Sequence, residues 1–151
     1  MNKDIWALYI GYLIISMNEI DGMTSTCRKK ILKKEVNNTW LSKTLSDKLK
    51  YLCKKLTADD SDIQKLKALF NEALDLCSTR NFAAHGQFVL DSSHILEEGE
   101  EIKFLLHSHK ENKPASQKEV EQATRRCIEL SNEISKYIAI IEMEIFRTHT
   151  V

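Results

Sequence analysis

Three polar side chains within a span of six residues, Arg80, Asn81 and His85, are of the types that phosphate and proton-transfer chemistry requires. The guanidinium of Arg80 is planar and permanently charged, which suits a phosphate group. Histidine is the side chain best placed to transfer a proton near neutral pH. Asn81 and His85 are four residues apart, so on a helix the amide could orient the imidazole or a phosphate oxygen. No Cys/His cluster with metal-ligand spacing accompanies them, and we expect chemistry without a metal or cofactor.

The element that must position these side chains is a helix predicted from Ser61 to His85, with Gly86 placed to end it. A projection at 100° per residue puts Asn81 in the middle of the apolar stripe, flanked by Arg80 and His85. Burying such groups is costly unless another helix, a second subunit or a ligand meets them. The stripe consists of Ile63, Leu66, Phe70, Ala73, Leu74, Cys77 and Ala84.

A purely structural role for the three side chains stays open. They could tie the following segment to the bundle, with Arg80 paired to a carboxylate such as Glu19 or Glu97. Glu19 lies in an otherwise apolar stretch and could face Arg80, either as an ion pair or as a group that supports the site. On this interpretation the motif would hold an interface together and do no chemistry.

The remaining periodicity predicts an all-α bundle of four long helices with up-down order, as a single domain over residues 1–151. Residues 4–34 are expected to form one long helix, and 116–146 the last helix. Between the third and fourth long helices, residues 87–109 could form a short β-hairpin or an ordered loop. The second helix is expected to carry Leu41, Leu45, Leu49, Leu52 and Leu56.

The first helix is apolar on two sides, and a helix of that kind is usually buried on two sides. In so small a bundle, the second side is a candidate surface for a homodimer. The first side carries Trp6, Leu13, Ile20 and Cys27, and the second Ile5, Leu8, Tyr9, Tyr12 and Ile15.

Composition limits the partners. The formal net charge of the 151 residues is zero, so overall charge does not favour nucleic acid, but residues 28–55 are rich in lysine and arginine. This basic stretch is either a solvated helix face or a weak RNA-binding patch. The four separated cysteines suit a reducing, cytoplasmic setting, and the apolar run 5–15 is too short to span a membrane. The patch would use Lys29, Lys30, Lys33 and Lys34.

The segment Arg80-Asn81-Phe82-Ala83-Ala84-His85-Gly86 resembles the Arg-polar-x3-His motif of HEPN domains, helical domains found in many prokaryotic toxins and defence proteins. Its place late in the third long helix, before an insertion and a final helix, is similar as well. Only these seven residues are specific, although the similarity of architecture covers the whole chain.

The resemblance implies an all-α bundle of four to five helices and a homodimer whose two motifs face each other. It also implies a metal-independent endoribonuclease in which an RNA 2′-hydroxyl attacks the adjacent phosphate. By this analogy His85 transfers the proton, Arg80 stabilises charge on the phosphoryl oxygens and Asn81 positions one of them. An antitoxin or regulatory protein is a further implied partner.

Two departures qualify the resemblance. Relatives paired with a nucleotidyltransferase antitoxin often carry Tyr two residues after the motif His, where this chain has Gln87. Many relatives also keep the fold without nuclease activity, so a non-catalytic module that binds nucleic acid, nucleotide or protein is the alternative. The pair His107 and His109 looks like half of a metal site, but no third ligand is placed by the sequence.

Overall fold

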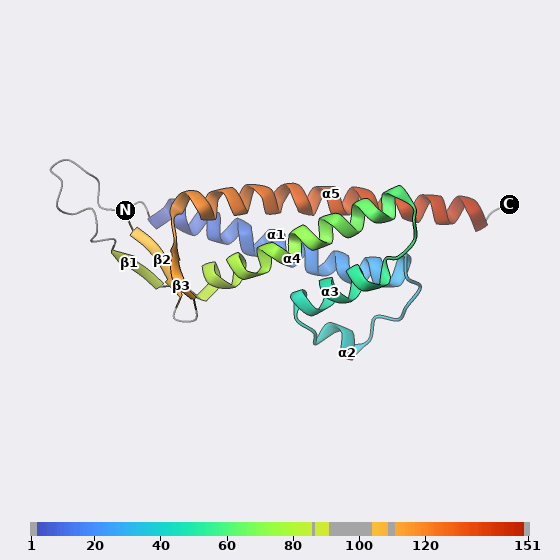
Figure 1. Ribbon diagram of the computed structural model, residues 1–151, viewed down its shortest axis with the longest axis horizontal. Helices are drawn as coiled ribbons and strands as arrows, with labels where there is room; N and C mark the ends of the chain where they lie inside the picture. Colours follow the sequence, from blue (N-terminus) through green and yellow to red (C-terminus); the bar gives the residue numbers. More distant parts are fainter. Residues whose placement is uncertain (1–2, 86, 91–103, 109–110, 150–151) are drawn as a thin grey trace.

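Two long helices, α1 (Lys3–Lys30) and α5 (Gln117–His149), lie side by side along the length of the molecule, as Figure 1 shows for a computed structural model of the chain. The other helices pack on one side of this pair. The structure describes residues 3–85, 87–90, 104–108 and 111–149.

Hydrogen bonds near the two ends of the pair establish that α1 and α5 are parallel. Near their starts, the Thr124 hydroxyl donates to the carbonyl of Tyr9 (3.0 Å). Near their ends, the Lys30 ammonium donates to the Glu142 carboxylate (2.7 Å). In an up-down bundle of four long helices, the first and the last would be antiparallel. The predicted up-down order is therefore wrong.

The cause lies in the connection after α1. The predicted helix 4–34 ends at Lys30, and the chain turns at Lys33, whose φ of 53° is left-handed. It then runs back through the short α2 (Asn38–Leu41) before α3 (Leu45–Lys55) begins. The expected single second helix is thus two helices, and α3 starts in the same direction as α1.

Aromatic contacts hold this returning segment in place. Trp40 of α2 is buried, and its indole N–H donates to the hydroxyl of Ser25 on α1 (3.0 Å). The Arg28 guanidinium lies 4.6 Å from the Trp40 ring centroid and 5.2 Å from that of Tyr51. Such cation–π contacts stabilise a cation over an aromatic face. They join the end of α1 to both α2 and α3.

Helix α4 (Ser61–His85) has the bounds that the sequence predicts, and it returns antiparallel to α3 and α5 (Figure 1). The helices share one apolar core, and the expectation of an all-α bundle is confirmed in this general form. Its largest fully buried side chains come from every helix: Trp6, Leu13, Met17, Ile20, Trp40, Leu49, Leu52, Leu56, Leu66, Phe70 and Leu130.

Three short strands lie between α4 and α5: β1 (Gln87–Leu90), β2 (Phe104–Ser108) and β3 (Glu111–Ala115). They form an antiparallel sheet in the order β1-β2-β3, and β2 contacts α4. Helix α5 then begins with a capping box: the Ser116 hydroxyl accepts from the Glu119 N–H, and the Glu119 carboxylate accepts from the Ser116 N–H. Among the described helices, none combines the length and apolarity that a membrane span requires.

Candidate functional site

A cleft of about 390 Å³ opens between α1, the start of α3 and the last turns of α4. Helix α4 contributes Cys77, Arg80 and Asn81 to its lining, and residues 44–46 add the N-terminus of α3. That end of a helix carries partial positive charge, and the Arg80 guanidinium carries a full positive charge. From α1 come Met17, Asn18 and Asp21. The cleft thus gathers two of the three motif residues.

Arg80 and Asn81 are joined to each other. The Arg80 Nη1 donates to the side-chain oxygen of Asn81 (3.0 Å). Arg80 is half-buried and Asn81 is exposed. Among the described residues no carboxylate pairs with Arg80, although Asp21 lines the same cleft. A guanidinium has five N–H donors, so Arg80 retains donors for an anion in the cleft.

The last two turns of α4 differ from the sequence projection. That projection places Asn81 in the middle of the buried stripe, but Asn81, Ala84 and His85 are exposed, and the buried residues are Phe82 and Ala83. The buried face changes because this end of α4 extends beyond α3 and contacts β2. The prediction of three polar groups on a buried face is therefore wrong for a single chain.

His85 is the last residue of α4, one turn beyond Asn81, and its side chain is exposed. It is not among the residues that line the cleft. Within one chain, the proton-transfer candidate is thus separated from the cleft that holds Arg80 and Asn81. A complete site would need a second chain, or a substrate long enough to reach both.

The acidic group in the cleft is Asp21, which the sequence analysis did not single out. Both of its oxygens accept from the Lys48 ammonium, at 2.9 and 3.2 Å. Only 4% of the Lys48 side chain is exposed, against 39% for Asp21. The sequence contained a signal for this pair, because Lys48 falls on the apolar stripe between Leu45 and Leu52. A lysine on a buried stripe requires a nearby carboxylate.

Glu19, the predicted acidic partner of Arg80, lies elsewhere. Its carboxylate accepts from the Ser131 hydroxyl of α5 (2.7 Å), and it does not line the cleft. The angular step along α1 explains this result, since Glu19 and Asp21 are 200° apart around the helix. Glu19 therefore supports the contact between α1 and α5. Gly86, the other supporting residue, and Glu97, the other predicted partner, lie outside the described residues.

Cys77 lines the cleft together with Arg80 and Asp21. Burial raises the pKa of its thiol, the charges of Arg80 and Lys50 lower that pKa, and the charge of Asp21 raises it by a smaller amount. A thiol with a raised pKa is a poor nucleophile at neutral pH. We therefore expect Cys77 to form part of the cleft wall and not to react.

The four lysines of the predicted basic patch lie at and beyond the end of α1. Lys30 pairs with Glu142 across the helix pair, whereas Lys29, Lys33 and Lys34 are exposed. From Asp21 to Lys30 the helix advances by roughly 13 Å. The exposed lysines are therefore neighbours of the cleft on the same helix and its following turn, and they are not part of its lining.

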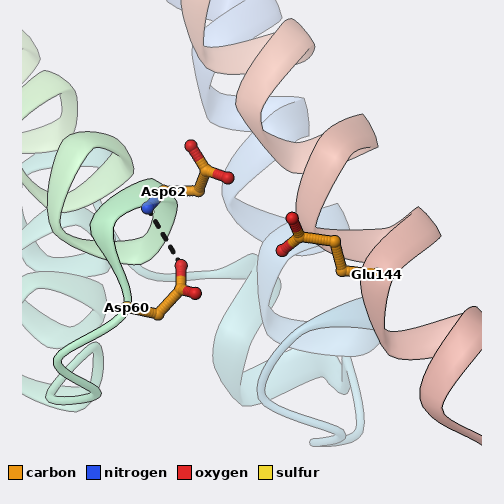
Figure 2. A group of neighbouring side chains, drawn as sticks. All are labelled: Asp60, Asp62 and Glu144. Carbon is orange, nitrogen blue, oxygen red and sulfur yellow. Dashed lines mark hydrogen bonds between the residues drawn. The ribbon is translucent and has the colours of Figure 1, made fainter.

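An acidic cluster occupies the other end of α4. The carboxylates of Asp60, Asp62 and Glu144 have oxygens within 4.8 Å of one another, where the start of α4 approaches α5 (Figure 2). Asp60 accepts from the backbone N–H groups of Asp62 and Ile63, at 2.9 and 3.1 Å. This is the geometry of a helix N-cap, and an acidic first turn also favours the helix dipole. Helix capping accounts for Asp60 without an ion.

His109 and the side chain of His107, which look like half of a metal site in the sequence, lie outside the described residues. In the described part of the chain, every buried side-chain nitrogen and oxygen has a hydrogen-bond partner. The cleft at Arg80, which gathers two motif residues, is the strongest candidate site in that part.

Comparisons of the chain with family models, with curated proteins and with solved structures return no match.

Proposed function

We propose that the protein is a metal-independent endoribonuclease of the HEPN type, toxin-like or related to phage defence, that acts as a homodimer in the cytoplasm. The observation that carries this proposal is the position of the motif. Arg80 and Asn81 line an open cleft, and His85 is exposed one turn farther along the same helix. The motif residues are thus accessible to a substrate.

Each residue has a defined role in the proposed reaction. Arg80 pairs with the scissile phosphate and stabilises the charge that grows on its oxygens. Asn81, already bonded to Arg80, orients the guanidinium and donates its amide N–H groups to the same phosphate. The ribose 2′-hydroxyl attacks phosphorus and loses its proton, the bond from phosphorus to the 5′-oxygen breaks, and His85 transfers a proton to that oxygen. The products are a 2′,3′-cyclic phosphate and a 5′-hydroxyl.

The dimer in this proposal uses the outer face of α1. Leu8, Tyr12 and Ile15 are between 49% and 54% exposed and recur at helical spacing, so they form one apolar stripe. Exposed apolar stripes of this kind are typical of interfaces. In this proposal the second copy supplies the His85 that one chain leaves outside its own cleft.

The direct test is cleavage of RNA by purified protein in EDTA, with end-group analysis of the products. The wild type should cleave and leave a cyclic phosphate, and His85→Ala should lower the rate by at least about 100-fold. Arg125→Ala, which changes an exposed arginine paired with Glu121 on α5, is the matched control and should keep full activity. Intact RNA after incubation with folded wild-type protein, over varied substrates, would contradict the proposal.

The dimer is tested separately by analytical ultracentrifugation. Ile15→Lys should shift the protein to the monomer and lower cleavage, because a charge would enter the apolar interface. Leu41→Lys is a matched control, since Leu41 is 55% exposed on α2, away from that stripe. A wild-type monomer at micromolar concentration would contradict the two-chain site.

One observation favours a second candidate function. Because His85 lies outside the cleft in the single chain, the cleft could bind a nucleotide, a nucleic acid or a regulatory partner without turnover. This non-catalytic HEPN module would bind RNA through Arg80, yet His85→Ala would change neither binding nor RNA integrity. Equal growth of cells that overexpress wild type or His85→Ala would favour it over a toxin.

A further inference from the structure

The ion pair between Lys48 and Asp21 has an unusual placement for a purely structural pair. The lysine side chain is 4% exposed and reaches from α3 to α1, while the aspartate side chain remains 39% exposed in the cleft. An apolar pair of similar size would join two helices at least as well, because burying an ammonium carries a desolvation penalty. The arrangement fixes the position of a carboxylate that ligands can reach.

The geometry of the pair determines what this carboxylate can still accept. A single nitrogen, Lys48 Nζ, lies 2.9 Å from Oδ1 and 3.2 Å from Oδ2, so it occupies the edge between the two oxygens. Paired donors, such as a guanidinium or the edge of a guanine base, need that same edge. The outward lone pair of each oxygen remains, and it accepts one donor at a time.

Arg80 faces the same cleft and leaves Asp21 unpaired on that side. Both charges line the cleft, yet in the described part of the chain no ion pair joins them. The cleft therefore offers a cation for an anionic group and, beside it, an acceptor for a single hydroxyl donor.

We infer that Asp21 accepts a hydrogen bond from the 2′-hydroxyl of a ribonucleotide whose 3′-phosphate pairs with Arg80, and that Lys48 is the residue that positions Asp21. This rests on the proposed function for the class of substrate. A ribose carries its 2′-hydroxyl beside the 3′-phosphate, which matches an acceptor next to a cation. The phosphate itself is repelled by Asp21, and this directs it to Arg80. The contact would distinguish RNA from DNA, because only RNA has the hydroxyl.

Binding of nucleoside 3′-monophosphates tests this inference without any turnover. Titration calorimetry should compare each of the four ribonucleotides with its 2′-deoxy counterpart. Wild type should prefer the ribonucleotide by about tenfold or more, the usual worth of a hydrogen bond to a charged group. Arg80→Ala should weaken both forms equally, because it removes the contact with the phosphate that they share.

The pair is then removed as a unit to keep the fold. Asp21→Leu combined with Lys48→Met replaces two charges by apolar groups and should bind ribose and deoxyribose forms equally. Lys48→Met alone keeps the Asp21 carboxylate but removes the ammonium that fixes its position. It should reduce the preference for ribonucleotides several-fold, a change that a merely structural lysine would not cause. Glu72→Gln with Arg126→Met removes a matched pair between α4 and α5 and should leave the preference intact.

The outcomes separate this inference from the function on which it rests. A preference that survives the double variant, in wild-type-like folded protein, overturns the role of Asp21 while binding through Arg80 stands. Arg80-dependent binding with no ribose preference in the wild type overturns it as well. If the wild type binds none of the eight nucleotides, both the inference and the nucleotide chemistry of the cleft are wrong.

Discussion

Arg80 belongs to helix α4 and Arg126 of α5 contacts that helix, but the two arginines have different surroundings. Arg126 of α5 binds both oxygens of Glu72 on α4, at 2.5 and 2.8 Å, and also contacts Glu129 and Glu133. Arg80 bonds only to the neighbouring Asn81 among the described residues. Asp21, the carboxylate that lines the same cleft as Arg80, is paired with Lys48.

The difference separates an arginine that joins helices from one that is kept for a ligand. Three carboxylates surround Arg126, and the hydrogen bonds that it donates to Glu72 raise its pKa above the usual value. Such a network leaves few donors for anything else. Arg80 lines an open cleft and, among the described residues, pairs with no carboxylate, while the acid in that cleft is paired with a lysine. The following variants test this contrast, from the largest expected effect to the smallest.

Arg80→Ala is expected to have the largest effect on function. It should lower RNA cleavage by at least about 100-fold, since it removes the charge that stabilises the phosphoryl oxygens. The free energy of unfolding, measured with urea, should change by less than about 0.5 kcal/mol, because no carboxylate is left unpaired. A loss of stability of about 1–3 kcal/mol with unchanged chemistry would instead assign Arg80 to the fold.

Asp21→Ala is expected to have the largest effect on stability. It leaves the buried Lys48 ammonium without a partner, which should cost roughly 2–4 kcal/mol of unfolding free energy. Asp21→Leu with Lys48→Met should recover most of that loss, because no buried charge remains. Urea unfolding of the two variants measures the difference. Equal destabilisation by both would mean that the helix contact, and not the charge, was lost.

Arg126→Met should lower the unfolding free energy by about 1 kcal/mol, because the carboxylates it contacts are partly exposed and each pair contributes little. RNA cleavage should stay within twofold of wild type, since Arg126 lies outside the cleft. Parallel urea and cleavage measurements with Arg80→Ala give the opposite pattern if the contrast holds. A cleavage defect in folded Arg126→Met would contradict the contrast between the two arginines.

The smallest effect concerns pH. The hydrogen bond from Arg126 lowers the pKa of Glu72 below its ordinary value of 4.5. The stabilisation is therefore present above pH 4.5 and is lost as pH falls through the lower pKa of the folded state. Glu72→Gln should cost less than about 1 kcal/mol at pH 7, and this difference from wild type should shrink as the pH falls below 4.5. A constant difference would exclude ionisation as its source.

Features set by neighbours in sequence were predictable. The bounds of α4 follow from its apolar periodicity and from Asp60 at its start, and the capping box of Ser116 and Glu119 begins α5. The burial of Cys27, Cys77 and Cys127 also follows from their places on apolar stripes. The chemical types of the motif were evident too, because they depend only on residue identity and helical spacing.

Contacts between distant segments were not predictable in the same way. The parallel course of α1 and α5 depends on how residues 31–44 turn back, and a connection of that length permits either direction. Periodicity placed Asn81 on a buried face, but the burial of a helix face depends on how far the neighbouring helices extend along it. For the same reason Asp21 was overlooked and Glu19 was favoured.

The sequence by itself determined the long helices, their apolar stripes and the polar groups at the end of α4, because helix formation is governed by residues within a few turns of one another. Only the tertiary structure decided which of those groups share a cleft. That outcome depends on pairings such as Lys48 with Asp21, 27 residues apart, whose energy depends on burial and on the direction in which each helix approaches.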